Sequence, residues 1–243
     1  MTEPIDPAAI PAPAPAPAPA VTYKDAVGST TGLASYWRLG ETSGTSSTAA
    51  KGTVTGTYSG MSLNRPSLLA NDTDAAVDLN GSSSMARYGD VYDFAGTSAF
   101  SLEAWVKPTT VDATSRRLFS KEWSNSSGIQ GYDLVQSSSK LQFARLRNGA
   151  YQAATAPSLA VGRTYHVVAT YDGSAMRLYV NGALVSTGAS TTQSVVEGTS
   201  VFTIGAKASG GGNFAGTIDE AAVYTGALSD QQVTDHYKVG MGA

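Results

Sequence analysis

The sequence predicts an all-β fold, an antiparallel sandwich of two sheets with one short C-terminal helix, behind an extended arm rich in proline and alanine. Three observations support this prediction. After residue 33, apolar and polar residues alternate, as they do in strands that bury one face. Asn-Gly and Asp-Gly pairs, the strongest short signals for a β-hairpin, recur between residues 148 and 182. Charged residues make up only 14% of the chain against 42% hydrophobic residues, a mixture that suits short strands joined by many turns.

The arm comes first in the chain. Seven of the ten prolines fall within residues 4–19, in a stretch that ends PAPAPAPAPA. Proline fixes φ and lacks an N–H, so we expect a polyproline-II-like rod roughly 50 Å long rather than a helix or central strand. One interpretation is a plain spacer; the other is an anchor that contacts a partner through Pro11, Pro13, Pro15 and Pro17. We therefore divide the chain into an arm, residues 1–27, and a sandwich domain, residues 28–243.

The first half of the domain contains strands separated by turn-forming residues. The predicted strands are LASYWRL (33–39), AAVDL (75–79), AFSLEAWVK (99–107), RRLFSKE (116–122) and GYDLVQ (131–136). In the third of them, Phe100, Leu102, Ala104 and Val106 share one face, because side chains alternate along a strand. That face is expected to lie in the core.

Three hairpins follow. Asn148-Gly149 joins KLQFARLR to AYQAATA, Asp172-Gly173 joins TYHVVATY to SAMRLYV, and Asn181-Gly182 leads into ALVST. Asn, Asp and Gly tolerate the positive φ that type I′ turns need. These signals predict an antiparallel meander with tight I′ turns.

The C-terminal part completes the sandwich with the strands SVFTIGA (200–206) and FAGTIDEAAVY (214–224). The helix SDQQVTDHYK (229–238) starts with a capping box, Ser229 followed three residues later by Gln232. Its Val233 and Tyr237 are expected to pack on the sandwich. The predicted core residues, all inside strands, are Trp37, Leu102, Trp105, Phe119, Phe143, Val167, Leu178, Tyr179 and Ile204.

Composition excludes several classes of function. The chain has no cysteine, so disulfides, thiolate metal sites and cysteine nucleophiles are excluded. No apolar run is long enough to span a bilayer. The net charge is −3 and no basic stripe is present, which argues against nucleic-acid binding. The start MTEPIDPAAI does not have the form of a secretory signal peptide.

Four segments resemble laminin-G-like members of the concanavalin-A-like superfamily. They are YWRLGETSGT, AFSLEAWVKP, TYHVVATYDGSAMRLYVNGALV and FAGTIDEAAVYTGALSDQQVTDHY, in the family's order over residues 33–238. The resemblance implies a jelly roll of two curved antiparallel sheets, consistent with the alternation above. It also implies a domain that binds glycans or proteins.

Catalysis is not indicated. Glycoside hydrolases on this fold carry E-x-D-x-x-E on one strand, which places two carboxyl groups on the same face. The chain has no such run. Asp219 and Glu220 are adjacent and are expected to point to opposite faces of the sheet. The two histidines, His166 and His236, belong to a strand and to the terminal helix without a local catalytic signature.

A structural Ca²⁺ ion is implied by the resemblance. Family members often use the Asp of G-x-I-D-E as a ligand, here Asp219, together with an early F-D-G-x-x-D segment. The matching stretch here is LNGSSSM, so Asn80 replaces the first Asp and Ser84 the second. One carboxylate is lost, so we expect weaker calcium affinity. The alternative is that Asp219 only forms hydrogen bonds within the sheet.

The candidate ligand-binding residues are polar or aromatic residues of the central strands and loops. They are Trp123, Asn125, Tyr132, Arg145, Arg147 and Tyr151, with the glycine-rich loop 209–213 beside them. Trp123 is expected in a loop, where it either stacks on a sugar or packs at a strand end. Arg145 and Arg147 share a strand face, which is alternatively an ordinary solvated surface.

Three hypotheses follow for function. The first is a non-enzymatic virion protein of a phage tail or head, anchored to other virion proteins by the arm and exposing its jelly roll to a host-surface glycan or protein. The second is a secreted or cell-wall bacterial module for adhesion. The third, disfavoured, is a glycoside hydrolase. The corresponding location is the virion surface or, alternatively, the extracellular space. The sequence shows no trimerisation heptads and leaves homo-oligomerisation open.

Overall fold

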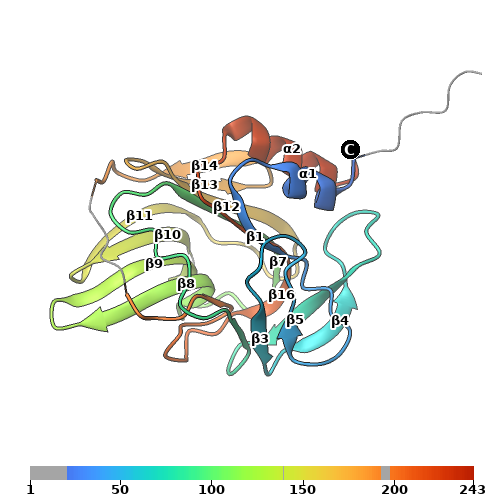
Figure 1. Ribbon diagram of the computed structural model, residues 1–243, viewed down its shortest axis with the longest axis horizontal. Helices are drawn as coiled ribbons and strands as arrows, with labels where there is room; N and C mark the ends of the chain where they lie inside the picture. Colours follow the sequence, from blue (N-terminus) through green and yellow to red (C-terminus); the bar gives the residue numbers. More distant parts are fainter. Residues whose placement is uncertain (1–20, 139, 193–197) are drawn as a thin grey trace, which may run out of the picture.

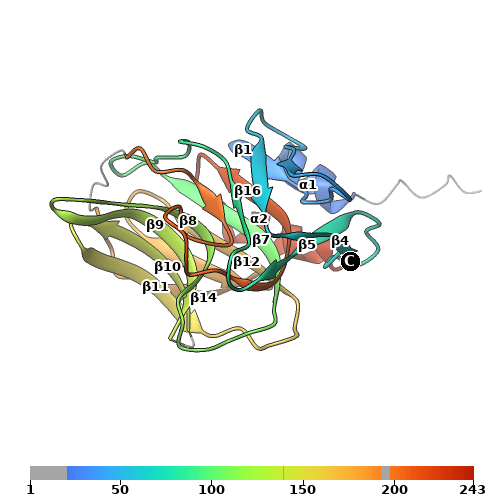
Figure 2. The same cartoon turned by 90° about the horizontal axis from the view of Figure 1, so that it is seen from below.

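The computed structural model describes residues 21–138, 140–192 and 198–243. In these residues the chain forms two antiparallel sheets that pack face to face, with two helices on the outer side of one of them (Figures 1 and 2). The structure therefore confirms the predicted all-β sandwich with one short C-terminal helix.

The first sheet, sheet A, contains eight strands. They are β1 (Leu33–Trp37), β4 (Ser62–Pro66), β5 (Ala75–Asn80), β7 (Phe100–Pro108), β12 (Tyr165–Tyr171), β13 (Met176–Val180), β14 (Ala183–Thr187) and β16 (Ala215–Tyr224). Their order is β14-β13-β12-β7-β16-β5-β4, and β1 pairs with β16 beside this path. Neighbours in space are often distant in sequence, as expected for a jelly roll.

The second sheet, sheet B, also contains eight strands. They are β2 (Ser46–Ser47), β3 (Gly56–Ser59), β6 (Met85–Arg87), β8 (Arg116–Asn125), β9 (Gly128–Ser137), β10 (Lys140–Arg147), β11 (Ala150–Pro157) and β15 (Thr203–Ile204). Their order is β11-β10-β9-β8-β15-β6-β3-β2. Four short strands, β2, β3, β4 and β6, were not predicted, because their polar sequences show little alternation.

The hairpin predictions are correct in place but not all in conformation. Asn148 and Asn181 have φ values of 51° and 52°, and the glycine after each has φ 76°, as a type I′ turn requires. Asp172 instead caps a longer turn, where its side chain accepts hydrogen bonds from the amides of Ser174 and Ala175. The I′ prediction is therefore wrong at Asp172-Gly173, since an Asx turn satisfies the backbone there.

The core between the sheets follows the predicted alternation. Phe100, Leu102, Ala104 and Val106 of β7 are all buried in it. The residues between them face the other side of sheet A, where Trp105 joins a second apolar cluster under the helices. Tyr179 also belongs to this second cluster, and the remaining predicted core residues lie in the main core.

Both helices lie against sheet A (Figure 1). The predicted helix is α2 (Asp230–Gly240), and its capping box between Ser229 and Gln232 is formed. The other helix, α1 (Tyr23–Ser29), buries Tyr23 and Val27 on the sheet. Residues 23–27 therefore belong to the domain, which corrects the arm boundary predicted at residue 27; a seven-residue helix is too short to show a periodic signal.

No helix in the described part of the chain is long and apolar enough to span a membrane. The prolines proposed as anchors, Pro11, Pro13, Pro15 and Pro17, lie outside the described residues.

Candidate functional site

Neither helix covers the side of strands β8 to β11 of sheet B that faces away from the core (Figures 1 and 2). Leu134 of β9 and Phe143 of β10 pair with each other and point into the core. By alternation, Asp133 and its partner Ala144 point to the opposite side. We call this side the outer face of sheet B.

Four charged residues form a network on the outer face. Arg117 Nε lies 3.3 Å from Asp133 Oδ2, and its Nη2 lies 3.4 Å from Glu122 Oε2. Lys207 Nζ lies 2.9 Å from Glu122 Oε1. The residues come from β8, β9 and the loop after β15, so the sheet register brings them together. We call this set the Arg117 network.

The two acids of the Arg117 network share a hydrogen bond and differ in pKa. Burial, followed by the charge of Glu122 and the hydrogen bond with it, raises the pKa of Asp133 to about 7. For Glu122, burial acts to raise the pKa, but hydrogen bonds with Asp133 and Lys207 and the charge of Arg117 lower it overall. A buried Asp133 Oδ1 has no other partner. Asp133 therefore carries the shared proton below about pH 7.

Tyr151 on β11 lies beside this network. Its side chain is 46% exposed, and its hydroxyl donates a hydrogen bond to Gln142 Oε1 at 3.0 Å. Burial of part of the ring, and then the charge of Asp133, raise its pKa to about 12. Leu146 pairs with both Tyr151 and Gly131, two residues along β9 from the exposed Ile129. The face thus combines a fixed, exposed aromatic ring with apolar and charged neighbours.

The glycine-rich loop 209–213 borders Arg117. The Arg117 amide donates to the Gly212 carbonyl at 2.8 Å. Gly212 has φ +59°, and a Cβ there would lie 2.7 Å from Arg117 Nη1 and 2.9 Å from the Ser115 carbonyl. Glycine is needed here because both the backbone conformation and the close approach of the arginine exclude a side chain.

Two of the predicted ligand-binding residues are in the core, so those predictions are wrong. Tyr132 is 1% exposed and its hydroxyl donates to the Tyr92 carbonyl at 2.7 Å. Arg145 is fully buried; its guanidinium stacks 3.8 Å over the Tyr171 ring and donates to the Gly96 carbonyl. A polar strand position looks solvated in sequence, but cation–π stacking allows it to face the interior.

The other predicted ligand residues lie in different places. Trp123 is in β8, paired with Gln130, rather than in a loop, and it is half-buried against Gly198. Asn125 is exposed at the end of β8, where its side chain accepts from the Ser127 amide at 2.9 Å. Arg147 is half-buried at the end of β10. Of the predicted ligand-binding residues, only Tyr151 is both exposed and adjacent to the Arg117 network.

The predicted calcium ligands are not brought together. Asn80 pairs with Ala215, four residues along β16 from Asp219. The Asn80 side-chain oxygen already accepts from the amides of Ser82, Ser83 and Ser84. The described residues contain no group of three or more His, Cys, Asp or Glu placed to hold a metal ion. These residues do not fit the calcium site that the resemblance implies.

Asp219 and Glu220 also differ from the prediction of opposite faces. The register of β16 shifts after Asp219, and Glu220 has φ 53°. This bulge lets Glu220 accept from Tyr36 and from Arg38, which also pairs with Asp72. Asp219 accepts from Ser67 and the Leu68 amide on the same outer side of sheet A. A bulge inserts one residue, so strict alternation fails there.

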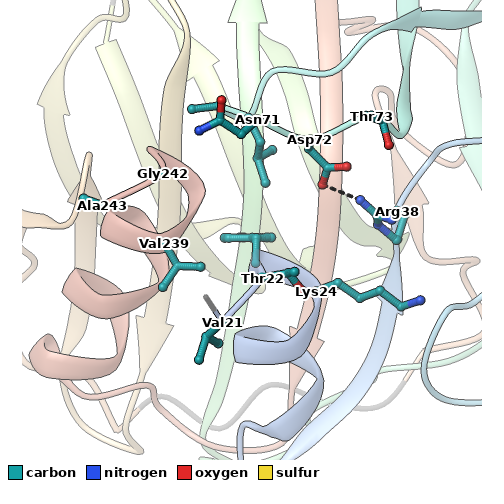
Figure 3. A pocket seen from close by; sticks show the side chains of 13 residues that line it. Val21, Thr22, Lys24, Arg38, Asn71, Asp72, Thr73, Val239, Gly242 and Ala243 are labelled. Carbon is teal, nitrogen blue, oxygen red and sulfur yellow. Dashed lines mark hydrogen bonds and ion pairs between the residues drawn. The ribbon is translucent and has the colours of Figure 1, made fainter. Parts of the chain in front are cut away.

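A cavity of about 470 Å³ lies beside these groups on the helix side of sheet A. Figure 3 shows that the start of α1, the loop at Asn71–Thr73 and the end of α2 surround it. Lys24 and the Arg38–Asp72 ion pair contribute its charges, and Val21 and Val239 its apolar walls. This cavity holds no aromatic side chain exposed as Tyr151 is.

The sequence also missed the acid–base network itself. Glu122 and Asp133 appear as two scattered carboxylates in the chain. The hairpin between Glu122 and Asp133 is the sequence feature that could have located the network. A turn at residues 126–127 pairs Ser120 with Asp133 and Glu122 with Gly131. Only that register shows that the two carboxyl groups share a face.

Comparisons with known proteins agree with this fold. The Laminin_G_3 model of the concanavalin A-like lectin/glucanases superfamily matches residues 71–234, more than half of the 243-residue chain. No curated protein sequence matches the chain.

Several solved structures are similar. Domain 4 of AbnA, an extracellular arabinanase from Geobacillus stearothermophilus solved with arabinotriose, is 23% identical with a TM-score of 0.57, over 84% of this chain and 98% of that one. Trypanosoma rangeli sialidase in complex with sialic acid is 18% identical with a TM-score of 0.63, over 90% and 37%. The binding domain of botulinum neurotoxin DC in complex with SialylT is 12% identical with a TM-score of 0.60, over 86% and 51%.

The chain spans about half of the neurotoxin binding domain and less of the sialidase. At these low sequence identities the solved structures show a shared fold only. Membership in the family rests instead on the family model, which matches more than half of the sequence. The chain belongs to the Laminin_G_3 family of the concanavalin A-like lectin/glucanases superfamily.

Proposed function

We propose that this protein is a non-catalytic carbohydrate-binding module that binds its glycan on the outer face of sheet B. The observation that carries the proposal is the exposed Tyr151 ring, held by Gln142 beside the Arg117 network. An aromatic ring fixed at one end offers a large apolar contact at low entropic cost. Charged and amide groups around it can exchange hydrogen bonds with sugar hydroxyls.

The comparisons support a ligand of this class. The arabinanase domain, the sialidase and the neurotoxin domain were solved with arabinotriose, sialic acid and SialylT, respectively. Each of these proteins contains a part that shares this fold, which is nearly all of the arabinanase domain, about half of the neurotoxin domain and less of the sialidase.

The geometry of the acids argues for binding rather than hydrolysis. A retaining glycosidase separates its two carboxyl groups by about 5–5.5 Å, and an inverting one by more, so that the sugar fits between them. Glu122 and Asp133 are hydrogen-bonded to each other and held by Arg117. They leave no room for a glycosidic bond between them.

A glycan array followed by calorimetry tests the proposal. Tyr151→Ala is expected to weaken binding of the best glycan by about tenfold or more, roughly 1.4 kcal/mol, as for a central aromatic contact. Leu184→Ala is the matched control, because Leu184 is also 46% exposed but lies on β14 of sheet A. Equal affinities for the wild type and Tyr151→Ala would refute the site, and an array without any bound glycan would refute the function.

We also propose a location for the module, on a virion surface or, alternatively, in the extracellular space or cell wall. The proline–alanine arm in front of a glycan-binding type of domain supports an appendage that is anchored at one end and exposed at the other. Particle proteomics with the full chain and with residues 21–243 tests this. Incorporation of the full chain alone supports the anchor, and incorporation of both forms contradicts it.

A further inference from the structure

Glu103 lies in the centre of sheet A, on the side covered by the helices, and is fully buried. Four groups from four elements contact its carboxylate: Tyr23 of α1 at 2.8 Å, Tyr224 of β16 at 2.5 Å, His166 Nε2 of β12 at 2.7 Å, and His236 Nδ1 of α2 at 3.0 Å. We call these five residues the Glu103 cluster. The proposed glycan site, on the other sheet, makes no use of it.

The hydrogen-bond geometry favours a hydrogen on each ring nitrogen of His236. Its Nδ1 lies 3.0 and 3.1 Å from the two Glu103 oxygens, and a carboxylate only accepts, so Nδ1 carries a hydrogen. Its Nε2 lies 2.9 Å from Thr30 Oγ1. The single Thr30 hydroxyl hydrogen is directed to the Ala26 carbonyl at 2.8 Å. Thr30 therefore accepts from Nε2, and both ring nitrogens of His236 donate.

His166 is in the opposite state. Its Nε2 donates to Glu103, while its Nδ1 is buried without a partner. A hydrogen on that nitrogen would be a buried, unpaired donor on a charged ring, which is more costly than an unused lone pair. His166 is therefore neutral. One imidazolium then balances one carboxylate, and the cluster as a whole carries no net charge.

We propose that His236 is an imidazolium whose buried ion pair with Glu103 locks helix α1 onto sheet A. The first residue of α1, Tyr23, donates to Glu103, and the residue at its C-cap, Thr30, accepts from His236. Both ends of the helix are thus tied to the same ion pair. A helix of seven residues has little stability of its own, so its position depends on these contacts.

The surrounding groups set the direction of the pH dependence. The titratable groups in and around the Glu103 cluster are Glu103 of β7, His166 of β12, Tyr224 of β16, Tyr23 of α1, Tyr36 of β1 and Asp235 of α2. Burial acts to lower the pKa of His236, but the charge of Glu103, the hydrogen bond to it and Asp235 raise it above the usual 6.5. Burial acts to raise the pKa of Glu103, and the two histidines hold it well below its usual value.

The lock therefore has two limits. A raised histidine pKa means that the stabilisation is complete below about pH 6.5 and is lost as the pH rises through the folded-state pKa of His236. A lowered glutamate pKa means that it is also lost in acid, as the pH falls through the folded-state pKa of Glu103. We therefore expect α1 to be released from sheet A at high pH. A cluster made of neutral groups alone would not show this release.

NMR of the full chain, labelled with ¹⁵N and ¹³C, tests the proposal between pH 5 and 9. At pH 7 we expect hydrogens on both ring nitrogens of His236 and on one of His166. As His236 loses its proton, the amide exchange of Tyr23–Ser29, corrected for the intrinsic pH effect, is expected to rise by about tenfold or more, because the helix opens more often once the ion pair is lost. The proposal would be overturned if His236 is neutral at pH 7. It would also be overturned if the amide exchange rates of α1 do not change as His236 titrates.

Three variants make the test independent of folding defects. Thr30→Val keeps the shape of the residue but removes the acceptor, so the His236 titration should move to lower pH and α1 should exchange faster at pH 7. Thr155→Val, on the exposed side of β11, is the matched control and should change neither. Glu103→Gln should abolish the upward displacement of the His236 titration altogether. A Thr30→Val protein identical to the wild type in both readouts would also count against the lock.

Discussion

The two sheets each carry a buried carboxylate in the middle of a strand, Glu103 on sheet A and Asp133 on sheet B, and they treat it in opposite ways. Glu103 is surrounded by four donors, one of them charged, and its pKa is well below the usual value. Asp133 faces another carboxylate, and its pKa is raised to about 7. Burial is similar in the two places, at 0% and 2% exposure. The partner, rather than the burial, decides the protonation state.

The two surroundings suit different tasks. Helices cover the Glu103 cluster, so its ion pair can hold elements together but cannot meet a ligand. The Arg117 network lies on the uncovered face beside an exposed tyrosine. Sheet A therefore uses its outer face for stability, and we propose that sheet B uses its outer face for binding.

The largest expected effect comes from breaking the Glu103 ion pair. Glu103→Gln leaves His236 charged or forces it to lose a proton inside the protein. We expect the free energy of unfolding at pH 7 to fall by about 3 kcal/mol, as when one partner of a buried ion pair is removed. Urea denaturation measures this. Glu122→Gln, on the other sheet, is the comparison, and an equal loss there would remove the distinction between the sheets.

Asp133→Asn should have a smaller effect that depends on pH. The folded-state pKa of Asp133, about 7, lies above its ordinary value of 3.8, so the folded protein holds a proton that the unfolded chain releases. The stability due to Asp133 is therefore present below about pH 4 and is lost as the pH rises toward 7. Asn does not titrate, so relative to the wild type the variant should gain roughly 2.5 kcal/mol between pH 5 and pH 8, about 1.4 kcal/mol for each pH unit between 5 and the folded-state pKa.

Denaturation series at both pH values check this difference. Glu220 also has a pKa of about 7, raised by burial and only partly offset by Arg38, so some slope should remain in the variant. A pH profile of Asp133→Asn that runs parallel to the wild type would show that Asp133 does not hold the shared proton.

The smallest effect is expected from calcium. Asn80 and Asp219 lie apart, and the Asn80 oxygen is already occupied by three backbone amides. We expect the melting temperature to change by less than about 1 °C at millimolar Ca²⁺, since a ligand that does not bind adds no stability. Magnesium at equal concentration is the control for ionic strength. A calcium-specific rise would restore the site that the family resemblance implies.

The fold was largely predictable because its signals are local. Alternation located the long strands, the Asn-Gly pairs located two I′ turns, and Ser229 with Gln232 located the start of α2. The prediction failed where the local signal was weak or misleading. Helix α1 is too short to show a helical periodicity in its apolar residues. Strict alternation predicted that Glu220 faces away from Asp219, but the bulge at Glu220 interrupts that alternation.

The sites were less predictable, since they depend on pairings between distant residues. Tyr151 was identified as an exposed aromatic residue, but Tyr132 and Arg145 have the same polar appearance and are buried. The Glu103 cluster joins Glu103 to residues that lie between 63 and 133 positions away from it in the sequence. No spacing rule in a single sequence connects such residues.

The sequence by itself determined the two-sheet sandwich, its main hairpins and its terminal helix, because backbone preferences and side-chain alternation act between near neighbours. Only the tertiary structure decided which carboxylate meets an imidazolium, which meets another carboxylate, and which aromatic ring remains exposed. Those outcomes depend on the register between strands and on which face the helices cover. In this protein that register gives sheet A its buried ion pair and leaves sheet B the face that we propose binds glycan.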